Sequence, residues 1–339
     1  MHYHITNMKF CLMDISNLIH RSKHVVSHYD SFDDCVGMVL SIAFNSIRKS
    51  FQAFEADHVV ACFDSKSWRK DVFEKYKADR VKDSSPLKIE QDEIIYTVID
   101  DLYSYFKDRT NVTVLKADKI EADDFIARWI ALHDDPSFEH VIVSSDGDFK
   151  QLIKEGVELY NPVSHTLYTT EGVYYDDGTP IRKDVPFVEL HGQKWKIKRD
   201  KKTGEPVTVE PKWELFEKCI RGKKNNLPTA FPRVRSTKMR EAFNDNGGEI
   251  WNNFINTMWG ESEKRQYVRE RYEFNKSLLD LTLQPEHIIN VMDNCISEQL
   301  EKPNKLMITP HFLKFCGRYR LPKLGEMHRF YSKILSSGY

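Results

Sequence analysis

The 339-residue chain lacks paired cysteines, long apolar runs and an excess of charge of either sign. Its six cysteines are scattered and form no C-x-x-C pair, which argues against a zinc ribbon and a disulfide framework and predicts a reduced, cytoplasmic protein. No apolar run approaches the ~20 residues that span a bilayer, and the first residues lack a basic segment followed by an apolar one, so no membrane or export signal is expected. The formal net charge is −1, so nucleic-acid binding requires segregated charge.

Apolar runs that end in carboxylates are the main feature that the chain does have. The run 141–143 leads into Asp146 and Asp148, which a single glycine separates. Similar runs end in Asp14 and Asp64. Such runs are typical of buried parallel strands, whose carboxyl ends meet at one edge of a sheet, where ligands collect. We therefore expect clustered carboxylates at that edge, with a divalent cation as the partner that neutralises them.

Each acidic group also has a simpler interpretation. In a lone D-G-D sequence, Asp148 can cap a helix that starts at Phe149. Glu121, Asp123 and Asp124 fall in the first turn of a predicted helix, where acids complement the helix dipole. We favour a metal site because all these acids belong to one β-α-β series.

Basic residues gather in separate segments, one directly after Asp64 and others at 194–202 and 221–240. In the first segment cations interleave with aromatic rings, which suits phosphates and unstacked bases, although a charged helix with one wet face explains it equally well. Its residues are Trp68, Arg69, Lys70, Tyr76, Lys77 and Arg80.

Hydrophobic periodicity predicts three parts. Residues 1–165 form an α/β domain with a parallel sheet, and an arch over about 66–106 stands above the acidic edge. Residues 166–211 alternate like strands and are predicted to be a β insertion that bridges two lobes. Residues 212–339 are predicted to be a mainly helical DNA-binding domain, with a helix-turn-helix around the basic turn 221–228.

Five motifs, in this order, resemble those of the flap endonuclease family of 5′ nucleases, and of its phage ribonuclease H members in particular. They are L-M-D at 12–14, F-D at 63–64, Y-K-A-D-R at 76–80, I-E-A-D-D at 120–124 and S-S-D-G-D-F at 144–149. The resemblance covers roughly residues 10–240. It implies a PIN-like α/β nuclease domain with a helical arch, and a helix-three-turn-helix DNA-binding element at 220–235.

The resemblance also implies roles for individual side chains. The metal-binding carboxylates would be Asp14, Asp64, Glu121, Asp123, Asp124, Asp146 and Asp148. The catalytic residues would be Asp14, Asp64, Asp124 and Asp146, together with Lys77 and Arg80 on the scissile phosphate. The nucleic-acid contacts would be Arg69, Lys70, Tyr76, Lys77, Arg80, Lys223, Lys224, Arg233, Arg235 and Lys238.

One turn departs from the family pattern. Where the family has G-D-x-x-D-N, this chain has Gly222 and Asn225 in place of both aspartates, with two lysines between them. A carboxylate cage without histidine suits Mg²⁺, which Mn²⁺ can replace. We therefore expect two ions, with the second site weakened by the missing negative charge.

The sequence thus predicts a structure-dependent 5′ to 3′ exonuclease and flap endonuclease of the ribonuclease H type, which removes primers or flaps during phage DNA replication or repair. The alternatives are a junction- or flap-binding protein with weak or lost cleavage, and a ribonuclease with a related acidic sheet. Expected partners are branched, flapped or nicked DNA and RNA–DNA duplex, with a single-stranded DNA-binding protein or a sliding clamp as protein partners. We expect a monomer in the host cytoplasm, without membrane contact.

Overall fold

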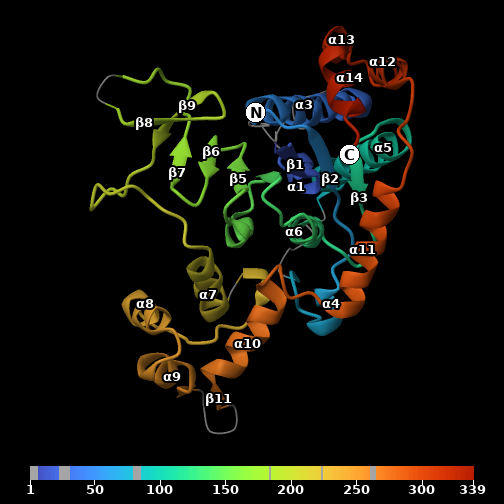
Figure 1. Ribbon diagram of the computed structural model, residues 1–339. Helices are drawn as coiled ribbons and strands as arrows, with labels where there is room; N and C mark the ends of the chain where they lie inside the picture. Colours follow the sequence, from blue (N-terminus) through green and yellow to red (C-terminus); the bar gives the residue numbers. More distant parts are fainter. Residues whose placement is uncertain (1–6, 23–30, 79–84, 183–184, 223, 260–264) are drawn as a thin grey trace.

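The centre of the computed structural model is a nine-stranded sheet with the order β3-β2-β1-β4-β5-β6-β7-β9-β8 (Figure 1). The structure describes residues 7–22, 31–78, 85–182, 185–222, 224–259 and 265–339. The parallel strands are β1 (Met8–Asp14), β2 (His58–Cys62), β3 (Thr113–Leu115), β4 (Phe138–Val143) and β5 (Val157–Asn161). The sheet continues antiparallel through β6 (Thr166–Tyr168), β7 (Val173–Tyr175), β9 (Gln193–Ile197) and β8 (Phe187–Leu190).

Alternation along the central strands separates two hydrophobic cores. In β1, Cys11 and Met13 join the core on one face, while Phe10 and Leu12 join the core on the other. The first core contains residues of α3 (Phe32–Ala53) and α5 (Pro86–Arg109), and the second contains residues of α6 (Ala122–Leu132) and α11 (Glu286–Leu300). Because both faces are covered, these strands are continuous apolar runs, as the sequence predicts for a parallel sheet.

The apolar runs that end in Asp14 and Asp64 form β1 and β2, as the sequence predicts, and α3 links these two strands. The short strand β5 was not predicted, whereas β6 to β9 lie within the β insertion predicted at 166–211. The basic aromatic segment after Asp64 contains only a four-residue helix, α4 (Arg69–Val72), followed by turns. None of the described helices combines the length and apolarity that a bilayer span needs.

The helical part of the chain divides between two places. A separate core holds α7 (Pro211–Arg221), α8 (Ser236–Asp245), α9 (Glu249–Ile255) and the start of α10 (Val268–Leu279), below the sheet in Figure 1. A small hairpin of β10 (Met258–Trp259) and β11 (Gln266–Tyr267) precedes α10.

The last helices return to the sheet instead of staying with α7 to α10. They are α12 (Ile308–Arg318), α13 (Pro322–Glu326) and α14 (His328–Ser336), and Phe312 and Tyr331 among their residues belong to the first core. In Figure 1 they lie beside α3 and α5. The sequence-based division placed all of 212–339 in one helical domain, and apolar periodicity could not show which surface each helix covers.

Candidate active site

Three acids lie at the carboxyl ends of neighbouring strands. Asp14 is the last residue of β1, Asp64 follows β2 by two residues, and Asp146 follows β4 by three. Since β2, β1 and β4 are adjacent and parallel, the three ends share one edge of the sheet. This is the arrangement that the strand pattern predicts.

Asp14 is buried and held in a fixed orientation. Its Oδ1 accepts a hydrogen bond from the Asn17 amide at 3.0 Å, which caps α1 (Ile15–His20), and its Oδ2 accepts one from Ser144 Oγ at 2.9 Å. Burial, together with the charges of Asp64 and Asp146, raises the pKa of Asp14 to about 7. The like charges of these acids therefore act on one another across the edge.

Asp146 and Asp148 open the 3₁₀ helix η1 (Gly147–Leu152). Asp146 Oδ1 accepts a hydrogen bond from the Asp148 amide at 2.9 Å, so Asp146, and not Asp148, is the capping residue. Asp148 Oδ1 lies 2.9 Å from Nζ of Lys218, and the same ammonium donates to the Gly147 carbonyl at 2.9 Å. Sequence reasoning missed Lys218, since nothing in its spacing distinguishes it from other lysines of α7.

Glu121 and Asp123 stand at the start of α6 and face the same edge. Glu121 is the N-cap residue and pairs with Lys77 Nζ. The Ala122 amide donates to Asp64 Oδ1 at 2.8 Å, which joins the start of α6 to the end of β2. Burial raises the pKa of Asp123 well above its usual range, against the opposing effect of Lys77 and with the help of the surrounding carboxylates.

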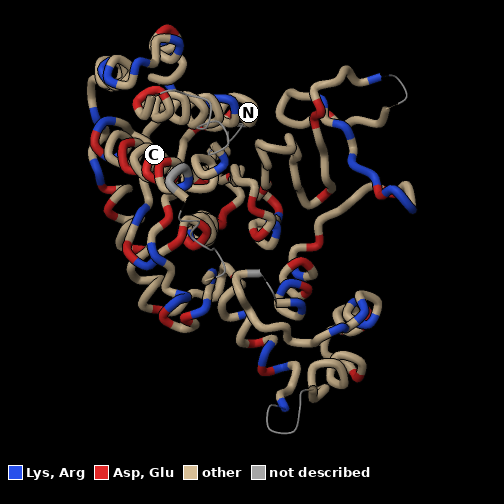
Figure 2. Tube along the Cα trace, turned by 180° about the vertical axis from the view of Figure 1, so that it is seen from behind, with Lys and Arg blue, Asp and Glu red and all other residues tan. Residues whose placement is uncertain are grey.

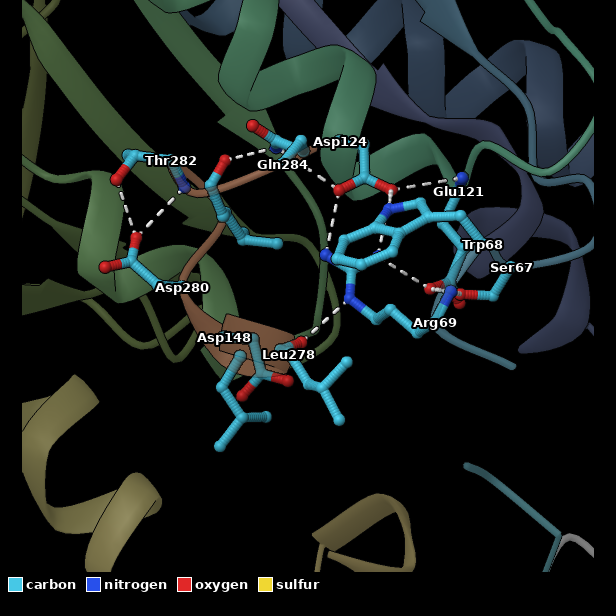
Figure 3. A network of polar contacts seen from close by, with 12 residues as sticks. Ser67, Trp68, Arg69, Glu121, Asp124, Asp148, Leu278, Asp280, Thr282 and Gln284 are labelled. Carbon is cyan, nitrogen blue, oxygen red and sulfur yellow. Dashed lines mark hydrogen bonds and ion pairs between the residues drawn. The ribbon is translucent and has the colours of Figure 1, made fainter. Parts of the chain in front are cut away.

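Asp124 was predicted to bind metal and Arg69 to contact nucleic acid, but the structure pairs the two side chains with each other (Figure 3). Arg69 is 2% exposed, and its guanidinium binds Asp124 in a bidentate ion pair at 2.8 and 2.9 Å. Arg69 also donates to Glu121 Oε2 at 3.0 Å and to the Leu278 carbonyl at 2.8 Å. A buried guanidinium needs such partners, so Arg69 is not available to a nucleic acid and the Asp124 oxygens are not turned to the acidic edge.

Two further side chains complete this buried network. Trp68 Nε1 and Gln284 Nε2 each donate to Asp124 at 3.2 Å. Tyr76, predicted to stack near the substrate, is 3% exposed and belongs to the second core. The pattern of basic and aromatic residues therefore reflects buried packing at Trp68, Arg69 and Tyr76. The Lys77 ammonium instead reaches Glu121, and Lys70 is exposed.

The turn between α7 and α8 has no room for a side chain at Gly222. Gly222 has φ 58°, and a Cβ at this position would lie 2.4 Å from the Pro228 carbonyl oxygen, so no side chain fits. The short helix η2 (Lys224–Asn226) follows, and the Asn225 carbonyl accepts a hydrogen bond from the Lys77 amide at 3.1 Å. The turn therefore packs against the segment that carries Lys77.

Some of the basic residues predicted to contact nucleic acid are exposed in the structure. Lys70, Arg233, Arg235 and Lys238 are exposed, the last three before and in α8. Figure 2 shows basic residues in this part of the chain and acidic residues around the ends of the central strands. Arg80 and Lys223 lie outside the described residues, as does the side chain of Lys224.

The donor chemistry of the edge fits a hard divalent cation. All the candidate ligands are carboxylate oxygens, and the raised pKa values of Asp14 and Asp123 show a crowding of negative charge that a cation would relieve. Among the described residues, no three acids, histidines or cysteines enclose a common point that could hold an ion. Binding an ion would therefore require carboxylate side chains to rotate toward it.

We expect the unfolding free energy of the metal-free protein to fall as pH rises. The pKa of Asp14 is about 7 in the fold, against about 4 in an unfolded chain, so its favourable contribution is present below pH ~4 and is lost as pH rises through about 7. Thermal melts in EDTA should show a lower Tm at pH 8 than at pH 5.5, and Mg²⁺ should raise the Tm more at pH 8. Asp14→Asn should flatten the pH dependence, and a melt that is equally steep in that variant would contradict this assignment.

Comparisons with known proteins agree with this geometry. Residues 9–177 match the family described as 5′-3′ exonuclease, N-terminal resolvase-like domain. The chain is 27% identical over 212 residues to a 5′-3′ exonuclease of Aquifex aeolicus, covering 58% of this chain and 69% of the relative. It is 31% identical over 163 residues to ribonuclease H of Enterobacteria phage T4, covering 45% and 52%.

Solved structures extend the likeness beyond the matched residues. The fold superimposes on the T5 D15 protein, crystallised with metal ions, with a TM-score of 0.59 and 15% identity, over 86% of this chain and 98% of the other. A T5 D15 flap endonuclease in complex with DNA and metal ions gives the same TM-score, 0.59, over 87% and 100%. At this identity the likeness concerns the fold alone.

Proposed function

The chain belongs to the 5′-3′ exonuclease family through its N-terminal resolvase-like domain, and we propose that it is a metal-dependent nuclease that cleaves flapped, nicked and RNA-primed duplexes. The observation that carries this proposal is the edge at which Asp14, Asp64 and Asp146 follow three adjacent parallel strands. Phosphodiester hydrolysis requires an activated water and neutralisation of charge on the phosphate and the leaving oxygen. A carboxylate edge that holds Mg²⁺ supplies both.

Different residues of the acidic edge would have different roles in this reaction. Asp14, Asp64, Glu121 and Asp123 would hold a first ion, and Asp146 with Asp148 a second. Bound Mg²⁺ would supply a nucleophilic water and Lewis-acid stabilisation. Ser144 and Asn17 fix the orientation of the Asp14 carboxylate. Lys77, placed at Glu121 by its backbone bond to Asn225, would offset charge that develops on the phosphate.

Lys77→Ala should reduce the cleavage rate far more than duplex affinity. Its ammonium reaches the acidic edge and not the exposed basic face, so its charge acts on the reacting phosphate. We expect kcat to fall about a hundredfold with Kd within about twofold. Single-turnover cleavage and anisotropy titrations measure the two quantities, with the exposed Lys70→Ala as the matched control. Equal losses in kcat and affinity would show simple electrostatic attraction instead. Arg80 stays a predicted partner of Lys77.

We also infer two ions of unequal affinity. Lys218 already pairs with Asp148, and the turn contributes Gly222 and Asn225 where carboxylates would add charge. Gly222 cannot carry a side chain, but Asn225 has φ 60°, which Asp also tolerates. Calorimetric titration with Mn²⁺ should show one tight and one weak site, and Asn225→Asp should tighten the weak one. Two equal sites in the unmodified protein would contradict this inference.

The helices α7 and α8 would bind the duplex. We propose that α7, its turn and α8 form the predicted helix-three-turn-helix, since Arg233, Arg235 and Lys238 are exposed at the start of its second helix. Cations there suit phosphate contacts, which position a duplex without reading its sequence. A monomeric state, a cytoplasmic location and contacts with a single-stranded DNA-binding protein or a sliding clamp stay predictions.

A second candidate function is flap binding without efficient cleavage. The Lys218–Asp148 ion pair and the missing acids of the turn favour it, because both weaken one side of a two-ion site. Digestion of matched DNA-flap, nicked and RNA-primed duplexes in Mg²⁺ separates the two. The nuclease releases short 5′-labelled products, whereas a binding protein shifts the substrates in a gel and leaves them intact.

A further inference from the structure

Residues 198–207, which we call the basic hairpin, form an ordered turn beyond β9. The Val207 amide donates to the Lys198 carbonyl at 2.9 Å, and the Asp200 amide donates to the Glu205 carbonyl at 2.9 Å. The Asp200 carboxylate accepts hydrogen bonds from the Lys202 and Thr203 amides at 2.8 and 2.9 Å. The tip of the hairpin therefore has a defined backbone, fixed by its own acidic residue.

The hairpin presents more positive charge than its fold requires. Lys198, Arg199, Lys201 and Lys202 are all exposed, against two acids, one of which is tied into the turn. Among the described residues, no ion pair is formed by any of the three lysines. Lys196, just before the hairpin, is by contrast buried and paired with Asp177. The hairpin lysines thus differ from a lysine that has a structural partner.

The base of the hairpin is joined to the helices α7 and α8, which we call the basic helical part. Three residues, 208–210, separate Val207 from the start of α7 at Pro211. Glu210, within this link, pairs with Arg240 of α8 at 2.6 Å, and the Arg240 guanidinium lies 3.7 Å from the ring centre of Trp213. Figures 1 and 2 both place the hairpin and α7 to α8 on the side of the molecule away from α5 and α11.

We propose that the basic hairpin is a second contact for the phosphate backbone of the duplex that α7 and α8 hold. This proposal rests on the proposed function and extends the bound surface beyond the helix-three-turn-helix. Lysines act as point charges on phosphates, without the geometry that reads bases. Residues 198–207 contain no aromatic ring, so the hairpin lacks the stacking platform that single strands need. The partner is therefore duplex backbone.

The test compares two double variants that make the same change of net charge. Lys201→Glu with Lys202→Glu alters the hairpin tip, and Lys314→Glu with Lys323→Glu alters exposed lysines of α12 and α13. Duplex affinity is measured by fluorescence anisotropy in EDTA over a range of NaCl concentrations. Each lost phosphate contact lowers the slope of log K against log salt by about 0.9. The hairpin variant should therefore lose about 2 from the slope and bind roughly tenfold more weakly at ~0.1 M salt.

The length of the duplex gives an independent readout. Contacts outside the helix-three-turn-helix require a longer duplex, so the defect should be large on an arm of about two helical turns and small on an arm of about one. A hairpin variant with the same slope as the α12–α13 control overturns the hairpin contact. A wild-type protein that binds no duplex overturns the proposed function as well, which distinguishes the two failures.

Discussion

Asp146→Ala should abolish cleavage of a flapped duplex while duplex binding remains intact or becomes stronger. Asp146 stands at the acidic edge, where its charge contributes to the raised pKa of Asp14. Removing a ligand from a two-ion site costs several kcal/mol of transition-state stabilisation, which is a loss of roughly a thousandfold or more in rate. Removing negative charge also reduces repulsion of phosphates, so affinity should not fall.

A second variant of Asp146 distinguishes the effect of its negative charge from the effect of its hydrogen bond at the start of η1. Asp146 accepts the Asp148 amide hydrogen bond that starts η1, and an alanine removes this cap together with the carboxylate. Asp146→Asn keeps an amide oxygen as acceptor and removes only the charge. Both variants should lose cleavage, and Asp146→Asn should keep the wild-type Tm. Cleavage at the wild-type rate in Asp146→Asn would show that this acid holds no ion needed for the reaction.

Arg69→Met should lower the free energy of unfolding by about 3–5 kcal/mol, because it leaves the Asp124 carboxylate buried without its cation. Asp124 is 0% exposed, and Arg69 supplies two of its hydrogen bonds. The same guanidinium donates to the Leu278 carbonyl at the end of α10, so the variant also loosens the link between the nuclease edge and the basic helical part. Urea denaturation with a constant m-value measures the change.

Two controls decide whether the loss comes from the buried charge. Lys119→Met breaks an exposed ion pair with Asp71 at 2.7 Å, and its effect should be far smaller than that of Arg69→Met because solvent screens the pair. Adding Asp124→Asn to Arg69→Met removes the stranded charge, so the double variant should be more stable than the sum of the two single losses. A loss in Arg69→Met no larger than in Lys119→Met would contradict the proposed role of this network.

The acidic edge can be predicted from the sequence because each strand and the acid at its end are encoded in one short stretch of the chain. An apolar run that ends in an acid predicts a buried parallel strand, and parallel topology then brings the ends of such strands together, as for Asp14 and Asp146. The residues that α3 contributes to the first core recur at helical spacing, which is a local signal of the same kind. Neither step requires knowledge of distant contacts.

The structure differs from the sequence-based predictions where distant contacts decide. Arg69 and Tyr76 belong to a basic and aromatic pattern that is the same whether the side chains face a nucleic acid or a core. Only the return of the chain at Leu278 and Gln284 shows that this region is covered. Lys218 reaches Asp148 because α7 packs on η1, a tertiary contact that no spacing rule reveals.

The central claim is that the carboxylate edge makes the protein a divalent-metal nuclease. The most direct test is a Mg²⁺ titration of the cleavage of a 5′-labelled DNA flap by the wild-type protein and Asp146→Asn, with both shown by anisotropy to bind the substrate. The wild-type protein should release product in proportion to bound Mg²⁺ and none in EDTA, and the variant should release almost none at any Mg²⁺ concentration. Tight binding without product in the wild type, or equal product from both proteins, would contradict the claim.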